Sequence, residues 1–380
     1  MMKIEELKKE KCCGCTACVQ VCPKNAIEFV YDERGFGYPS INKKLCVNCG
    51  LCEKVCQFKK KKDMDFKQEY YAAKCTDDKI RLKSRSGGIF FLLAKKVIQK
   101  SGVVYGVVLD SDMNVRFDRA TSLEECQRMQ GSKYVESSIS GIYTKVKQDL
   151  QNDRYVLFSG TACQVAGLYG YLGLAKFDKL FTIDIVCHGV SSAKVYKDFI
   201  GFAEKKYKGK IEQFNFRDKS FGWDSTVESY IINGKKHYSR NYSRLFYSIA
   251  AMRPSCAECP FASYNRPADM TVADFWGLRK IAPDFDDDRG VSAIMVNSEK
   301  GKAMLQMILG DLQYFEVSKD DCAQPNLLRP TPKSEKTEAF WNLYERKGIK
   351  SILNKYGAYD LLRRIKWKVI DLPQLLKNTK

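Results

Sequence analysis

The chain has 380 residues, 44% of them hydrophobic and 29% charged, with a formal net charge of +19. This length and balance indicate a soluble protein of two or three domains. There is no apolar run of about eighteen residues for a membrane span, and the charged N-terminus lacks a signal peptide's apolar stretch, so we expect a cytoplasmic protein. The basic residues are spread along the chain without a recognised binding motif, which argues against a nucleic-acid partner.

Sixteen cysteines in a reducing compartment indicate metal ligation or redox chemistry rather than disulfides. Two runs share the spacing x2, x2, x3, which is typical of bacterial ferredoxins with two 4Fe–4S clusters, and the fourth cysteine of each run serves the other cluster. The predicted ligand sets are therefore Cys12, Cys15, Cys18 and Cys56 for one cluster, and Cys46, Cys49, Cys52 and Cys22 for the other.

Zinc is the alternative for these cysteines. Zinc ribbons use two separated cysteine pairs, not four cysteines within eleven residues, so the clusters are favoured. Residues 25–29, followed by Gly35 and Gly37, predict a short strand and a turn. Cys13 is interpreted as a spare thiol.

The composition changes after this module. We expect a ferredoxin-type domain over residues 1–58, a lysine-rich linker over 59–69, a larger domain over 70–330 and a helical tail over 331–380. Strands and helices alternate in the larger domain, so the predicted fold class is mixed, α+β or α/β.

The larger domain begins with Ser86-Gly87-Gly88 before a buried helix over 89–98, then a strand over 103–109. Ser122 and Glu125 form a capping-box pattern. Residues 155–158 predict a strand, 159–161 a turn, 163–172 a helix and 180–186 a second strand. This is a βαβ unit, whose two strands should be parallel.

Cys163 and Cys187 follow the two strands of that unit. Parallel strands place their carboxyl ends on the same edge of a sheet, where open α/β sheets bind ligands. Cys256 and Cys259 add a Cys-x2-Cys pair, and the four together predict a third 4Fe–4S site. For each cysteine alone, a small buried hydrophobe is the competing interpretation, and it is favoured for Cys75, Cys126 and Cys322.

No motif by itself proves a flavin, since neither a Gly-x-Gly-x-x-Gly turn nor a Walker A loop is present. Residues 269–277 predict a strand that ends in Asp274-Phe275-Trp276-Gly277, which is either a shelf for a flavin or cluster or a plain hydrophobic corner. His188 adjoins Cys187 and is expected to tune that site by hydrogen bonding. Gly167, Gly170 and Gly173 support no prediction.

Taken together, these motifs resemble the beta-subunit family of coenzyme F-420 hydrogenases and dehydrogenases, in the form with a fused N-terminal dicluster ferredoxin domain. The resemblance runs from about Cys12 to about Phe315. Its marks are Ser86 to Gly88, Gly131 to Val135, Gly160 to Gln164, Cys187 to Val190, the Cys256/Cys259 pair with Phe261-Ala262, and Asp274 to Gly277.

The resemblance implies a non-Rossmann FAD site beside an iron–sulfur cluster. Ser86, Gly87 and Gly88 would approach the FAD phosphates through backbone N–H groups. Lys133 and Tyr134 would line the isoalloxazine, where a cation tunes the flavin; a plain surface lysine is the alternative for Lys133. The remaining implied cofactor residues are Gly131, Ser132, Gly160, Thr161, Asp274 and Trp276. No catalytic residue is assigned beyond the tuning role of Lys133.

The chain departs from the family pattern at Ala162, Ser191 and Ala273, all on the substrate side. The family includes lysine-rich bacterial members associated with polysaccharide genes, whose hosts make no deazaflavin. The resemblance therefore leaves the substrate open.

The tail carries a basic amphipathic pattern. Leu361, Leu362, Ile365, Val369 and Ile370 can share a face, with Arg363, Arg364, Lys366 and Lys368 opposite. Packing of the apolar face on its own domain or on a partner is favoured over a membrane surface.

The sequence thus predicts an iron–sulfur flavoprotein oxidoreductase. Electrons would pass between ferredoxin or another redox protein, the two N-terminal clusters, the third cluster and FAD, and reach a two-electron substrate. The alternatives are a non-catalytic electron-transfer subunit docked on a partner enzyme and a zinc-stabilised interaction protein.

Overall fold

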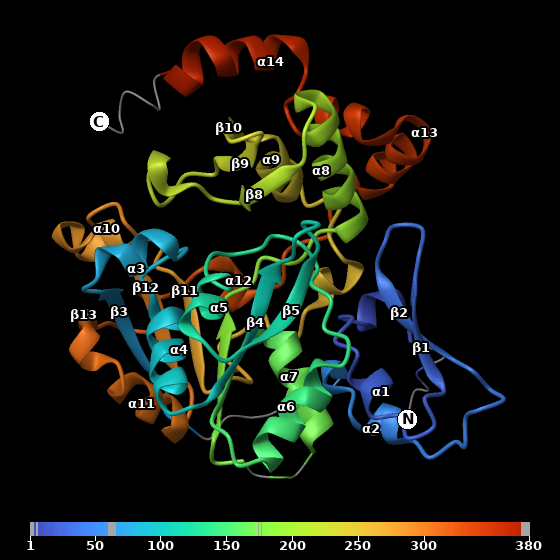
Figure 1. Ribbon diagram of the computed structural model, residues 1–380, viewed down its shortest axis with the longest axis vertical. Helices are drawn as coiled ribbons and strands as arrows, with labels where there is room; N and C mark the ends of the chain where they lie inside the picture. The colour runs from blue at the N-terminus through green and yellow to red at the C-terminus, as the bar shows by residue number, and fades with distance from the viewer. Residues whose placement is uncertain (1–3, 5–6, 60–65, 174, 176, 374–380) are drawn as a thin grey trace.

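The computed structural model describes Ile4 and residues 7–59, 66–173, 175 and 177–373. The largest element in these ranges is an eight-stranded mixed sheet (Figure 1). Its strands are β3 (Glu69–Cys75), β4 (Val103–Leu109), β5 (Val115–Ala120), β6 (Val156–Thr161), β7 (Leu180–Ile185), β11 (Met270–Asp274), β12 (Ser292–Val296) and β13 (Leu312–Glu316). They lie in the order β13-β3-β12-β11-β7-β6-β4-β5.

The middle of this sheet is parallel: β4 pairs with β6, β6 with β7, and β7 with β11 in the same direction. The predicted βαβ unit is therefore confirmed, with α7 (Ala162–Leu172) as its crossover helix. The predicted turn over 159–161 is wrong. Residues 159–161 pair with 183–185 of β7, so the ladder keeps them extended until Thr161 caps α7 in a capping box with Gln164.

Helices cover both faces of the sheet (Figure 1). On one face lie α4 (Ile89–Gln99) and α11 (Glu299–Gln306), and on the other α6 (Ile142–Gln151) and α7. Side chains along β6 alternate between the two faces of the sheet. Leu157 packs on the α4 side, and Val156 and Phe158 pack on the α7 side. The expected helix over 89–98 and strand over 103–109 are confirmed. The result is a mixed α/β fold of three layers.

Short helices connect these layers. They are α3 (Asp78–Lys83), α5 (Leu123–Gln127), α10 (Leu278–Ile281) and α12 (Pro325–Leu328). The predicted capping box opens α5, because Ser122 and Glu125 exchange side-chain to backbone hydrogen bonds.

The N-terminal module packs beside α6 and α7 (blue in Figure 1). It contains the hairpin β1 (Ile27–Tyr31) and β2 (Gly37–Ile41), with α1 (Ala17–Gln20) and α2 (Leu51–Lys54). The predicted strand and turn are confirmed, and Gly35 adopts φ +79° between the two strands. Positive φ at this position favours glycine.

A smaller lobe, built around the three-stranded sheet β10-β9-β8, lies beside the eight-stranded sheet (Figure 1). It contains β8 (Ile211–Asn215), β9 (Glu228–Ile232), β10 (Lys235–Ser239), α8 (Ala193–Tyr207), α9 (Asn241–Tyr247) and α13 (Thr337–Lys355). The tail is helical as predicted, and α13 buries Phe340, Trp341 and Tyr344 in this lobe. We refer to these strands and helices together as the small lobe.

The last described helix is α14 (Leu361–Lys366), which continues through residues 367–371. Packing of its apolar face on the chain's own domain is not observed, because Leu361, Leu362, Ile365 and Val369 are all exposed, and packing on a partner stays a prediction. The side chain of Ile370 and the lysines at 60–62 lie outside the described residues. Within the part of the chain that is described, no helix is long and apolar enough to cross a bilayer.

Candidate iron–sulfur and flavin site

The first predicted cluster site is a cavity in the N-terminal module. Cys12, Cys15, Cys18 and Cys56 line it, so the fourth cysteine of the second run reaches the first run. Burial, then the neighbouring Cys12 and Cys56 thiolates, raise the pKa of Cys18 to about 12. Bringing several thiolates together in a buried place requires a cationic partner, and an iron–sulfur cluster supplies one. This donor set fits a 4Fe–4S cluster.

The second predicted set lies at the outer end of the module. Cys49 is exposed, and Cys22, Cys46 and Cys52 are half-buried. Cys22 Sγ accepts a hydrogen bond of 3.3 Å from the Ala26 N–H. Exposed apolar side chains surround these cysteines, namely Leu45, Val47 and Leu51. An exposed cluster site with an apolar rim suits contact with another redox protein.

The third predicted set is assembled from three separate segments. Cys163 lies in the first turn of α7, Cys187 follows β7, and Cys256 and Cys259 lie in and directly after the turn Pro254–Glu258. Burial and then the Cys163 thiolate raise the pKa of Cys187 to about 12, and burial and then Cys163 raise that of Cys259 to about 11. Burial and then the Cys187 thiolate raise the pKa of Cys256. The four thiols therefore influence one another's charge, and the third ligand set stays a prediction.

Cys13, interpreted as a spare thiol, lies between the first and third sites. It lines one cavity together with Cys15 and Cys163. Around it is an apolar cluster of Phe58, Ala162, Ala166 and Phe261, and Cys56 and Cys259 pack against the same cluster. The inner module site and the third site are therefore direct neighbours. The tandem Cys12-Cys13 was the signal in the sequence that could have indicated this contact.

The module reaches α7 through two glycines of that helix. A Cβ on Gly170 would lie 2.2 Å from the Val55 carbonyl oxygen, and one on Gly167 would lie 2.9 Å from the Cys15 Cβ. Only glycine permits this approach of backbone to backbone. The spacing of Gly167 and Gly170, three residues apart on one helix face, therefore had structural meaning that we did not assign from the sequence.

A buried ion pair holds the third site in place. Arg266 Nη2 lies 2.9 Å from Asp184 Oδ1 and also donates to the Ile185 carbonyl, while Nη1 donates to the Phe261 carbonyl at 2.5 Å. Thr271 Oγ1 donates to the same carboxylate at 2.7 Å. Burial raises the pKa of Asp184, against the lowering effect of Arg266. The pair ties the segment after Cys259 to the end of β7, two residues before Cys187.

Arg253 joins the module to the rest of the chain. It is 1% exposed, and its Nε and Nη2 donate to the carbonyls of Cys12 at 2.9 Å and Gly37 at 2.8 Å. Its Nη1 pairs with Glu136 at 2.6 Å, and Nη2 lies 3.8 Å from Cys12 Sγ. A buried cation beside a cluster ligand favours the reduced cluster, because reduction adds negative charge.

His188 has a different position from the one predicted. The hydrogen bond to Cys187 Sγ comes from the Gly189 N–H at 3.3 Å, while His188 Nδ1 lies 3.4 Å from Asn326 Oδ1. Its ring packs against Phe246 and Tyr247, and its Nε2 is buried without a hydrogen-bond partner. His188 therefore lies between the third site and an aromatic surface.

The Ser86-Gly87-Gly88 turn precedes α4, as the flavin prediction requires. The Ser86 hydroxyl and the Gly87 N–H already donate hydrogen bonds within the protein. Ser86 Oγ donates to the Val291 carbonyl at 2.6 Å, and the Gly87 N–H donates to Ser292 Oγ at 2.9 Å. A Cβ on Gly87 would lie 2.4 Å from the Ala73 carbonyl oxygen. Close packing on β3 and β12 thus accounts for Gly87, while Gly88 has φ +92° at the start of the helix.

Lys133 caps a helix. Its ammonium donates to four backbone carbonyls of residues 128–131, at 2.9 to 3.2 Å, directly after α5. Gly131 is exposed, Ser132 is half-buried, and Gly160 and Thr161 end β6, where Thr161 Oγ1 lies 3.1 Å from Cys163 Sγ. Of these residues, Thr161 contacts the third site.

Other predicted residues meet around an arginine that the sequence analysis did not single out. Arg85 Nη2 pairs with Asp274 at 2.9 Å, and its guanidinium lies over the Trp223 ring. Trp223 stacks on Trp276 with ring centres 5.1 Å apart and planes 9° apart. Arg85 is buried, and its Nε has no hydrogen-bond partner. Its position directly before Ser86 was the available signal.

Tyr134 continues this surface toward the third site. Its ring lies 4.9 Å from Phe246 and 6.5 Å from Tyr247. Burial raises the pKa of Tyr247 to about 12, with further effects from Tyr134 and from Arg217 and Arg85. Aromatic rings and buried cations therefore share one place, and partnerless donors at Arg85 and His188 are suited to a planar, anionic cofactor such as FAD.

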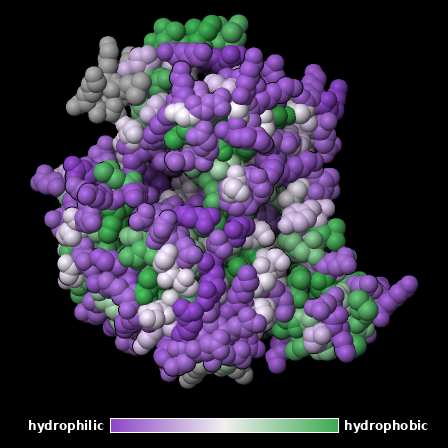
Figure 2. Space-filling view, viewed as in Figure 1, coloured by the Kyte–Doolittle hydropathy of each residue, from purple (hydrophilic) through white to green (hydrophobic). Residues whose placement is uncertain are grey.

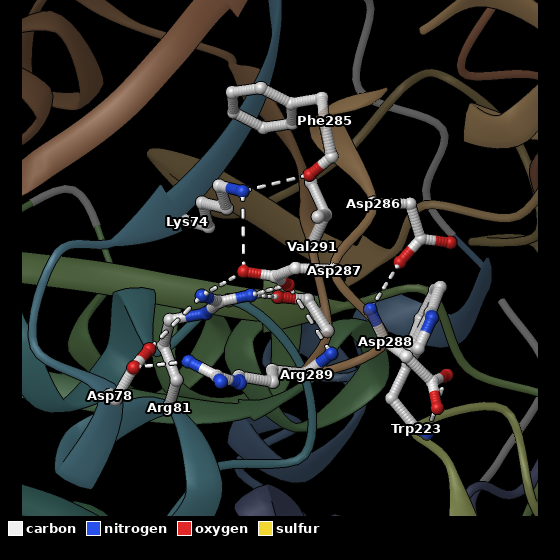
Figure 3. Close-up of polar contacts among 12 residues, drawn as sticks. Lys74, Asp78, Arg81, Trp223, Phe285, Asp286, Asp287, Asp288, Arg289 and Val291 are labelled. Carbon is white, nitrogen blue, oxygen red and sulfur yellow. Dashed lines mark hydrogen bonds and ion pairs between the residues drawn. The ribbon is translucent and has the colours of Figure 1, made fainter. Parts of the chain in front are cut away.

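An acidic loop over residues 286–288 contacts Lys74 of β3 and Arg81 of α3 (Figure 3). Asp287 accepts two hydrogen bonds from Arg81, one of them 2.7 Å, and lies 3.4 Å from the Lys74 ammonium. Arg81 is 3% exposed and also donates to the Gly290 carbonyl. Lys219 completes the arrangement by donating to the carbonyls of Arg81, Ser86 and Arg289.

Asp287→Asn is expected to lower the free energy of unfolding by about 2–3 kcal/mol at neutral pH, because the nearly buried Arg81 loses its counter-charge. Burial raises the pKa of Asp287. The hydrogen bonds and charge of Arg81, and then the charge of Lys74, outweigh this effect and leave that pKa below its usual value. The stabilisation is thus present above the carboxyl's unfolded pKa and is lost as pH falls through the lower folded pKa. Denaturant unfolding of the unchanged chain and of Asp287→Asn, between neutral and acidic pH, measures the difference in their free energies of unfolding. A difference that stays the same in acid contradicts this prediction.

Comparison with known proteins agrees with this arrangement. Residues 153–321 match the family model for the C terminus of the coenzyme F420 hydrogenase/dehydrogenase beta subunit, and residues 11–60 match a 4Fe–4S dicluster domain. The chain therefore carries the C-terminal domain of that beta-subunit family behind an N-terminal dicluster domain. The resemblance noted from the motifs is confirmed, together with the N-terminal dicluster domain. The segment over 153–321 contains all four cysteines of the third site.

Two individual proteins are similar to parts of the chain. An uncharacterized ferredoxin of Methanocaldococcus jannaschii is 40% identical over 48 residues, which are 13% of this chain and 61% of that ferredoxin. The match thus spans less than two thirds of the ferredoxin's length. A chain of the F420-reducing [NiFe] hydrogenase complex from Methanosarcina barkeri superposes with a TM-score of 0.46 and 14% identity, covering 75% of this chain and 90% of that one.

Two further observations concern the cysteines. Cys75, Cys126 and Cys322 are buried, in agreement with their structural interpretation. Among the described residues no group of three or more His, Cys, Asp or Glu side chains is arranged to hold a single metal ion.

Proposed function

We propose that the protein is an iron–sulfur flavoprotein oxidoreductase that relays electrons between a redox protein and a two-electron substrate. The observation that carries the proposal is that Cys13, Cys15 and Cys163 line one cavity. It makes the inner module site and the third site neighbours across one apolar cluster. The ligand sets are those predicted, with Cys12, Cys15, Cys18 and Cys56 inner, Cys22, Cys46, Cys49 and Cys52 outer, and Cys163, Cys187, Cys256 and Cys259 third.

The path begins at the exposed outer set and ends beside the aromatic surface. A ferredoxin or similar protein would dock on the apolar rim around Cys49. Electrons would then pass to the inner and third clusters and leave past Cys187 and His188. Thr161 and the Gly189 N–H, at 3.1 and 3.3 Å from cluster cysteines, would hydrogen-bond the third cluster's sulfurs.

Bound FAD would exchange electron pairs with the substrate and single electrons with the clusters. The residues that would hold it are Arg85, whose buried guanidinium suits a phosphate, and the aromatic Tyr134 and Tyr247, which suit a ring system. Trp276, stacked on Trp223 and 40% exposed, would shelter the ring from water. Lys133 would act through its helix cap, by fixing the backbone that precedes Tyr134.

Anaerobic purification tests the proposal. We expect about twelve irons per chain, four for each of three clusters, and a flavin absorbance that bleaches on reduction. About eight irons per chain would show that the third cluster is absent. Absence of flavin after reconstitution would favour the alternative, an electron-transfer subunit docked on a partner enzyme. Stoichiometric zinc without iron would contradict both.

The substrate is assigned to one of two classes, a deazaflavin or an intermediate of polysaccharide biosynthesis. Reoxidation of the reduced flavin by a member of either class, followed by absorbance, identifies which. Reoxidation by neither class, with flavin and iron present, contradicts this part of the proposal alone.

A further inference from the structure

The helix α14 and the residues that follow it expose an apolar stripe to solvent. Leu361, Leu362, Ile365 and Val369 are 66%, 78%, 51% and 68% exposed. Figure 2 shows this stripe as a green band at the top of the molecule, above a largely hydrophilic surface. Large apolar side chains exposed together on one helix indicate an interaction site rather than a folded core.

The opposite side of the same helix faces the small lobe. Arg363, Arg364, Trp367 and Asp371 line a cavity of about 580 Å³ between the helix and β10 and α9. Arg240 from the lobe lies over the Trp367 ring, 5.1 Å from its centre. The helix is thus held to the body by its polar side, which leaves the apolar side facing outward.

The surroundings of the stripe are strongly cationic. Lys235, Lys236, Arg240 and Arg244 from the lobe line the cavity together with Arg363 and Arg364, and Asp371 is its one carboxylate among the described residues. Lys366 and Lys368 of the helix also line this cavity, and both are exposed. The Nε of Arg240 is buried without a partner, and burial and then Arg244 lower the pKa of this side chain. The cations of this surface outnumber its carboxylates, so the surface complements an anionic one.

We propose that this C-terminal surface docks on an anionic phospholipid bilayer. The apolar stripe enters the boundary between headgroups and acyl chains, while Lys366, Lys368 and the cations of the lobe bind lipid phosphates. Each side of the helix then has a chemically matched neighbour.

A second copy of the chain fits this surface less well. Two such surfaces would place like charges opposite each other, which is unfavourable. A stable dimer also buries about 800 Å² on each partner, far more than four side chains of one short helix provide.

Flotation of the full anaerobic protein with vesicles tests the proposal. We expect binding to phosphatidylglycerol-containing vesicles, weak binding to pure phosphatidylcholine, and release at high salt, because surface charge interactions are screened. Leu362→Gln combined with Ile365→Gln should weaken binding about tenfold or more, since both exposed side chains lose apolar contact with the bilayer. Lys366→Glu with Lys368→Glu should abolish the preference for anionic lipid.

Leu82→Gln is the matched control, because Leu82 is 55% exposed on α3, away from this surface. It should bind vesicles as the unchanged chain does. All variants alter exposed side chains, and unchanged iron content and melting temperature verify their folding. Failure to bind anionic vesicles, equal binding by Leu362→Gln/Ile365→Gln, or a dimer that this variant dissociates would each overturn the proposal. Competition by inorganic phosphate without an effect of the apolar changes would also overturn it.

Discussion

Arg266→Met is expected to destabilise the protein by about 3–5 kcal/mol, because it leaves the fully buried carboxylate of Asp184 without its counter-charge. Methionine retains the aliphatic volume but none of the hydrogen bonds to Asp184, Ile185 and Phe261. The segment that follows Cys259 is then no longer tied to the end of β7. We therefore also expect loss of the third cluster, about four irons per chain, while the module keeps its two.

Anaerobic denaturant unfolding and iron analysis measure these two effects. Arg363→Met is the matched control, since Arg363 and its partner Asp360 are 57% and 38% exposed; exposed pairs contribute about 0–1 kcal/mol. Full stability together with a full iron content in Arg266→Met would show that the buried pair does not organise the third site.

Gly170→Val is expected to separate the N-terminal module from α7. The new Cβ would lie 2.2 Å from the Val55 carbonyl oxygen, and a backbone atom cannot rotate away as a side chain can. Overpacking of this kind costs about 1–3 kcal/mol. We expect both parts to keep their clusters, while electrons that enter the module reach the third cluster much more slowly, since the contact at Cys13 and Cys163 opens.

Rapid-freeze spectroscopy after mixing with reductant follows the arrival of electrons at the third cluster. Gly201→Val is the control, because Gly201 also lies in a helix, α8, but a Cβ there has no atom within 4 Å. It should transfer electrons at the rate of the unchanged chain. An unaltered rate in Gly170→Val with intact clusters would mean that the module does not transfer electrons through this contact.

The sequence by itself predicted the features that depend on neighbouring residues. Cysteine spacing within one loop indicates a cluster because the loop alone supplies three of its ligands. The same holds for the Ser122 capping box and for the parallel strands β6 and β7, whose pattern follows from local propensity and a short crossover. Cys163 and Cys187 could be placed together because parallel strands share an edge.

Only the tertiary structure decided which distant segments touch. Cys13 meets Cys163, and Asp184 meets Arg266 82 residues later, because the module packs on α7 and the Cys259 segment folds over β7. The sequence shows that Gly170 is small but not that Val55 lies against it. The charge of Lys133 is compatible with a helix cap or with a flavin, and only the structure shows that it donates to four carbonyls after α5.

The same distinction applies to the tail. The amphipathic pattern of α14 was readable from residue spacing, but which side meets the protein was not. Cations and Trp367 line the cavity toward the small lobe, so the apolar side is left facing outward. Local periodicity gives a helix two faces, while the charge and shape of its neighbours decide which face is buried.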